Sequence, residues 1–100
     1  MTFRIEFHAE ISNDYNKAYD WYEQQKPGLG ERFLSAVRTK LEQVALHPET
    51  YGQKTKKGYR EARLDVFPFI IVYKIYYRKE VIFINALHHQ RKHPRKKFRR

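Results

Sequence analysis

The spacing of hydrophobic residues changes twice along this chain, and that change constrains the fold more than any other feature. Near the start, Phe3, Ile5 and Phe7 alternate with polar residues, as in a half-buried strand. Over residues 11–45 the apolar positions recur every three or four residues, as on one face of a helix. From Ala62 onwards the alternation returns. The sequence therefore predicts one strand, then a helical segment, then a group of strands.

Prolines divide the helical segment into two helices. The residue before a proline disfavours the α conformation, so we expect the first helix to end near Lys26 and the second to stop at His47-Pro48. The turn Pro27-Gly28 between them suits the start of the second helix. The two apolar stripes are Ile11, Tyr15, Ala18, Tyr19 and Tyr22, and then Leu29, Phe33, Val37, Leu41 and Val44. Because the connection is short, the helices form an antiparallel hairpin.

Three strands follow the helices. Residues 60–66 alternate, Phe67-Pro68 interrupts, and residues 69–77 and 81–88 form two β-prone strands joined by a tight turn. Short connections make these strands pair antiparallel. The order β-α-α-β-β-β predicts an α+β fold, an antiparallel sheet with the helical hairpin packed on one face. We expect a single domain over residues 1–100, with a basic, mobile tail over about residues 95–100.

The charge of the chain is concentrated in its second half. Residues 54–100 carry fifteen basic and three acidic side chains, whereas residues 1–53 carry six and eight. This asymmetry favours a polyanionic partner, although a role in solubility alone is the alternative. The absence of cysteine excludes disulfides, thiolate catalysis and zinc–thiolate sites. Apolar runs are short and no signal peptide is visible, so we expect a cytoplasmic protein with no membrane partner.

Polar residues on the predicted strands are expected to share the sheet face opposite the helices. If Phe69 and Ile71 point towards the helices, the alternation directs polar side chains of all three strands outwards. These residues, with two nearby arginines, are Arg60, Arg63, Lys74, Asn85, His89 and Arg91. They predict a basic groove for phosphates or for an acidic peptide. The alternative is an ordinary solvated sheet face.

Histidines and tyrosines near the strand ends allow several interpretations. His88 and His89 with His93 imitate a metal site, but the segment has no carboxylate and its positive charge opposes a cation, so we expect no metal and no cofactor. For His88 we favour packing or hydrogen bonding, and for His89 a role in general acid–base catalysis stays open. Tyr76 and Tyr77 either stack bases or pack at the rim, and we favour packing.

Three segments together resemble the RelE/ParE toxin superfamily. They are Asp20 to Gln25 with the following Lys26-Pro27-Gly28-Leu29-Gly30 turn, the strands around Arg63-Leu64 and Phe67-Pro68-Phe69, and the ending Ala86 to Pro94. The resemblance covers nearly the whole chain and implies the toxin of a type II toxin–antitoxin pair. It further implies a cognate antitoxin whose acidic, partly disordered segment covers the basic surface of the toxin.

The resemblance does not decide what the target is or whether the protein is an enzyme. RelE-like members cut mRNA on the ribosome with Lys, Arg and Tyr, and the candidates for that role here are Arg63, Lys74, His89 and Arg91. Arg63 matches one family cation, but Glu61 and Ile70 occupy positions of two others. Losing two cations weakens a nuclease, so we favour the ParE-like alternative, in which the target is DNA gyrase. A non-toxic basic nucleic-acid-binding module and a degenerate toxin are the remaining alternatives.

Overall fold

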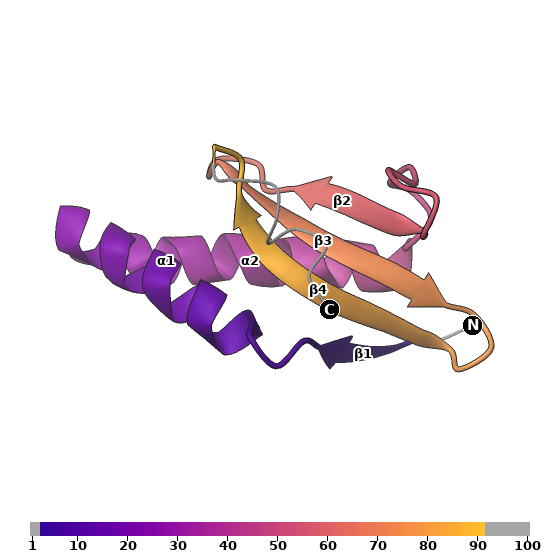
Figure 1. The fold of residues 1–100 in the computed structure, drawn as a ribbon. Helices are drawn as coiled ribbons and strands as arrows, with labels where there is room; N and C mark the ends of the chain where they lie inside the picture. The colour runs from indigo at the N-terminus through magenta and orange to yellow at the C-terminus, as the bar shows by residue number, and fades with distance from the viewer. Residues whose placement is uncertain (1–2, 92–100) are drawn as a thin grey trace.

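The computed structural model describes residues 3–91, and its elements follow the predicted order (Figure 1). They are β1 (Arg4–Phe7), α1 (Ile11–Gln25), α2 (Leu29–Leu46), β2 (Tyr59–Arg63), β3 (Phe69–Tyr76) and β4 (Val81–His89). Both helices end where the prolines predicted. The α+β class is confirmed, and the two helices lie side by side on one face of the sheet. The expected tail at residues 95–100 lies outside the described residues.

The sheet has the strand order β1-β4-β3-β2. The pairs β2–β3 and β3–β4 are antiparallel, as predicted for strands joined by short connections. The first strand differs, because β1 pairs parallel with β4 and places Arg4 opposite Val81. The sheet is therefore mixed and not wholly antiparallel. The chain leaves β1 through the helical hairpin, so β1 pairs with a strand that arrives much later, and no local turn fixes its direction.

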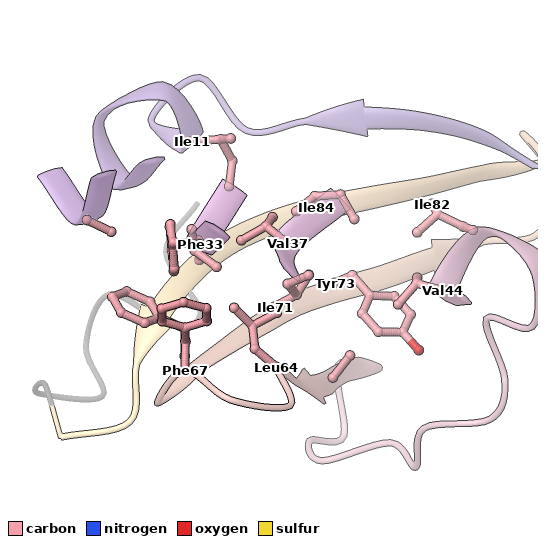
Figure 2. Packing of buried hydrophobic residues seen from close by; sticks show 14 of the residues in the cluster. Ile11, Phe33, Val37, Val44, Leu64, Phe67, Ile71, Tyr73, Ile82 and Ile84 are labelled. Carbon is pink, nitrogen blue, oxygen red and sulfur yellow. The ribbon is translucent and has the colours of Figure 1, made fainter. Parts of the chain in front are cut away.

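The core lies between the helical hairpin and the sheet. Figure 2 shows Phe33, Val37 and Val44 of α2 lying against Ile71 and Tyr73 of β3, and all five side chains are almost fully buried. Burying an aliphatic or aromatic side chain contributes about 1.5–3 kcal/mol, so this layer supplies much of the stability. The predicted stripes supply the helical half of the core, except that Tyr19 lies outside it and its hydroxyl donates to the Glu31 carboxylate.

An aromatic cluster closes one end of this core. The ring centroids of Tyr22 and Phe67 lie 4.9 Å apart, those of Phe33 and Phe69 5.0 Å apart, and those of Phe33 and Phe67 5.3 Å apart. Most of these contacts are edge-on, which is the arrangement that aromatic quadrupoles favour. The cluster joins both helices to β3 and to the loop before it.

The turn of the helical hairpin is held by Glu23 of α1. Its carboxylate accepts hydrogen bonds from the backbone amides of Gly28 at 3.0 Å and Gly30 at 2.9 Å. Gly28 has a φ of 90°, which side chains rarely adopt. A Cβ at position 30 would lie 2.9 Å from both the Glu23 carboxylate and the Tyr19 ring. A side chain of α1 therefore satisfies amides at the start of α2, where helices leave donors unpaired.

Two polar side chains are buried at the edges of the core. The Tyr73 hydroxyl donates to the carbonyl oxygen of Pro48 at 2.6 Å, and burial raises the pKa of Tyr73. Lys40 is only 8% exposed, and its ammonium lies 3.5 Å from the Asp65 carboxylate and 3.4 Å from the Tyr51 hydroxyl. The lysine stem thus packs in the core while its charge reaches the rim.

Candidate functional site

Arg63 and Lys74 lie on the outer face of the sheet, the face that points away from the helices, as predicted. Arg63 alternates with core residues on β2, and Lys74 alternates with Tyr73 and Ile75, which face the helices. The two cations do not converge, however. Lys74 lies opposite Tyr59 in the β2–β3 register. Tyr59 is four residues before Arg63 on β2, which separates the two backbone positions by about 13 Å along the strand.

Asn85 does not present its side chain to solvent, although the predicted groove requires this. Asn85 is 1% exposed, and it lies at a bulge where Val72 pairs with Ala86 but Tyr73 pairs with Ile84. Asn85 is therefore the extra residue of β4. A bulge interrupts the alternation of side chains, so residues after it face the opposite way from the predicted pattern. For this reason Ala86 packs on the outer face, with Ile70 and Val72.

The same bulge places His89 on the helix side of the sheet, which corrects the predicted outer position. His89 pairs with Phe69 of the core, and the two rings meet edge-on at 5.0 Å. His88 therefore lies on the outer face, opposite Ile70, and is buried. Arg91 follows the strand, is exposed, and its backbone amide donates to Nδ1 of His89 at 3.0 Å.

Arg60 also faces the helix side and does not join the predicted groove. It lies two residues from Ala62 of the core and so shares its face of β2, and its guanidinium donates to the backbone carbonyl of Tyr51. Tyr77 lies near by, with its hydroxyl 3.0 Å from the Glu49 carboxylate and its ring edge-on to Phe3. Tyr77 therefore packs at the rim, as favoured. The six predicted residues do not form one groove.

Lys74 and two tyrosines form a compact group at one end of the outer face. The Lys74 ammonium lies 5.7 Å from the centroid of the Tyr59 ring and 5.2 Å from that of Tyr76. Cation–π attraction at such distances holds the ammonium between the rings. Tyr76 is 40% exposed, so the group is open to solvent.

A groove of about 620 Å³ lies between α1 and the end of β4, and the sequence analysis missed it. Lys17 and Trp21 form its helical wall, and Phe69 and Leu87 contribute its apolar lining. The Asp14 carboxylate joins the two walls, because it accepts a hydrogen bond from the Leu87 amide at 3.1 Å. Trp21 is 57% exposed. Its position off the apolar stripe of its helix is visible in the sequence and is a signal for an exposed aromatic surface.

Residues 3–91 contain no group of three or more His, Asp or Glu side chains placed to hold a metal ion, and His93 lies outside them. Burial raises the pKa of Tyr15, and a hydrogen bond from its hydroxyl to Glu31 raises that of Tyr19. Both phenols therefore stay protonated near neutral pH and do not act as bases. Neither helix in this part of the chain is long and apolar enough to cross a membrane.

Comparisons with known proteins agree with this fold. The chain is similar to a structure of the chromosomal ParDE toxin–antitoxin system from P. aeruginosa, with 14% identity and a TM-score of 0.76, covering 88% of this chain and 96% of the other. It is also similar to a double mutant of the E. coli toxin RelE in the free state, with 16% identity and a TM-score of 0.63, covering 91% and 86%. At these identities the likeness shows the fold alone. No curated protein matches the chain. The family model of the ParE toxin of the type II toxin–antitoxin system parDE matches residues 5–94, so the chain belongs to the ParE toxin family.

Proposed function

We propose that this toxin stops growth by binding a protein target, DNA gyrase, and that it does not cut RNA. The chain is the toxin component of a type II toxin–antitoxin system, and its partner is an antitoxin. The gyrase proposal places the site of action in the cytoplasm.

The separation of the cations is the observation that supports this proposal. Cleavage by a 2′-hydroxyl develops charge on one phosphate, which several donors must contact together. The backbone positions of Arg63 and Lys74 lie about 13 Å apart along the strand direction. His89 lies on the other face. The positions of Arg63, Lys74 and His89 therefore give no support to a shared contact with one phosphate.

The cognate antitoxin is proposed to present an acidic, partly disordered segment. The excess of twelve positive charges over residues 54–100 attracts such a segment and speeds its association. A segment that folds on binding can cover a large surface with modest affinity per unit area. We therefore expect the complex to form more slowly as salt rises.

The decisive experiment pairs two readouts on one induced chain. RNA 5′ ends are mapped across the transcriptome after induction, and the purified toxin is added to a gyrase supercoiling assay. Growth arrest without new 5′ ends, together with loss of supercoiling, is the expected result.

The alternative is a ribosome-dependent mRNA endonuclease of the RelE type, with which the chain shares its fold. New 5′ ends within translated codons would establish it and refute the gyrase proposal. The double variant Arg63→Ala with Arg91→Ala then tests the site, because cleavage that survives both changes excludes these residues. Normal growth with intact supercoiling would refute both mechanisms.

A further inference from the structure

One end of the sheet combines lysines with tyrosines, at a distance from the groove beside α1. We call this surface the lysine–tyrosine patch, and it consists of Lys54, Lys56, Lys57, Tyr59, Lys74 and Tyr76. The lysines of residues 54–57 are exposed in the loop before β2, and Lys74 and Tyr76 come from the adjacent β3. The patch lies at the opposite end of β2 from Arg63.

The loop that carries three of these lysines is held in one conformation by its own hydrogen bonds. The Gly58 amide donates to the Thr55 carbonyl at 3.1 Å, and the Tyr59 amide donates to the Thr55 hydroxyl at 3.2 Å. The Lys54 amide donates to the Tyr59 carbonyl at 2.7 Å. The loop also lies beside Lys74, because a Cβ on Gly58 would be 3.6 Å from its side chain. The loop that carries three exposed lysines therefore lies beside the Lys74 side chain of β3.

The tyrosines give this surface a second chemistry. Tyr76 is 40% exposed, and Lys74 lies over its ring and over that of Tyr59. Aromatic rings between cations match a strand whose flat bases alternate with phosphates. An acidic peptide would use the lysines but has few groups that stack on the rings. A duplex keeps its bases paired inside the helix, so it would contact the lysines without stacking on the tyrosine rings.

We propose that the lysine–tyrosine patch binds single-stranded nucleic acid, with a base stacked on Tyr76 and neighbouring phosphates on Lys74 and the loop lysines. RNA and DNA strands share this chemistry. The anisotropy assay described below reads this site, whereas the supercoiling assay reads the gyrase proposal. Failure of one proposal therefore leaves the other standing.

Fluorescence anisotropy with labelled 12-nucleotide oligo-U, oligo-dT and a duplex of equal length tests the proposal on the purified full chain. We expect both single strands to bind more tightly than the duplex. Tyr76→Ala should weaken their binding about ten-fold, and Tyr76→Phe should keep it, because stacking needs the ring and not the hydroxyl. A preference for oligo-U or oligo-dT identifies the source of the strand, and equal affinity indicates that the site reads the shared chemistry.

Two controls separate this site from general attraction to a basic chain. Trp21→Ala removes an exposed aromatic ring elsewhere and should change the affinity less than two-fold. The double variant Lys56→Gln with Lys57→Gln should reduce the slope of log affinity against log salt by about 1.4, the value for two lost phosphate contacts on a single strand. Unchanged affinity in Tyr76→Ala, or a duplex bound as tightly as the single strands, would overturn the proposal.

Discussion

Replacing Glu23 tests how far one side chain fixes the helical hairpin. Its carboxylate accepts two backbone amides at the start of α2, at 3.0 and 2.9 Å, one exposed and one partly buried. A lost cap costs about 1 kcal/mol, and bonds to a charged acceptor cost more when they are buried. We therefore expect Glu23→Ala to lower the free energy of unfolding by about 2 kcal/mol. For a chain of this size that corresponds to a fall in Tm of about 10 °C.

The measurement is urea and thermal unfolding followed by circular dichroism. Glu23→Gln keeps one carbonyl acceptor without the charge, so its effect should be about half that of the alanine variant. Glu42→Ala, an exposed glutamate on α2, is the matched control and should stay within about 0.5 kcal/mol of the native chain. If Glu23→Ala unfolds like Glu42→Ala, the two bonds do not hold the turn and the reasoning is refuted.

Three further changes test the core by the same unfolding assay. Gly30→Ala should lower the free energy of unfolding by about 1–2 kcal/mol, because the new methyl group has no space, although alanine favours a helix more than glycine does. Gly52→Ala is the control and should be neutral, because a Cβ there has nothing within 4 Å. Tyr73→Phe should cost about 1–2 kcal/mol, and exposed Tyr76→Phe little. Because the pKa of Tyr73 is raised in the folded state, native stability should hold below pH of about 10, fall above it, and fall less in Tyr73→Phe. Lys40→Met should change the free energy of unfolding by less than about 1 kcal/mol, because methionine keeps the packing of the lysine stem and the ion pair is partly exposed. Lys40→Ala removes the stem and should lower the free energy of unfolding by about 2 kcal/mol or more. Equal losses in the two variants would contradict this account.

The helical hairpin was predictable from sequence because its signals are local. The stripe spacing and the residues before Pro27 and Pro48 determine where both helices run, and the structure places their ends within a few residues. The three later strands were predictable for the same reason, since short connections leave only antiparallel pairing. The pairing of β1 was not predicted, because its partner is distant in sequence and no turn joins them.

The candidate site was less predictable because it depends on one irregularity. The alternation of polar and apolar residues gives no sign of the bulge at Asn85. The bulge reverses the face on which each later residue of β4 lies. Arg63 and Lys74 lie on strands without the extra residue, so their predicted face is right. His89 follows the bulge and lies on the opposite face from the predicted one. The groove beside Trp21 was missed because it forms between two elements that sequence patterns treat separately.

The position of β4 has a consequence during synthesis of the chain. This strand is made after every other element, yet it lies between β1 and β3 and pairs with both. Until it emerges, β1 has no neighbour in the sheet and one edge of β3 stays open, so the nascent chain exposes unpaired backbone. A chain that stops before Val81 therefore lacks the strand that joins β1 to β3, and only β2 and β3 of its sheet can pair.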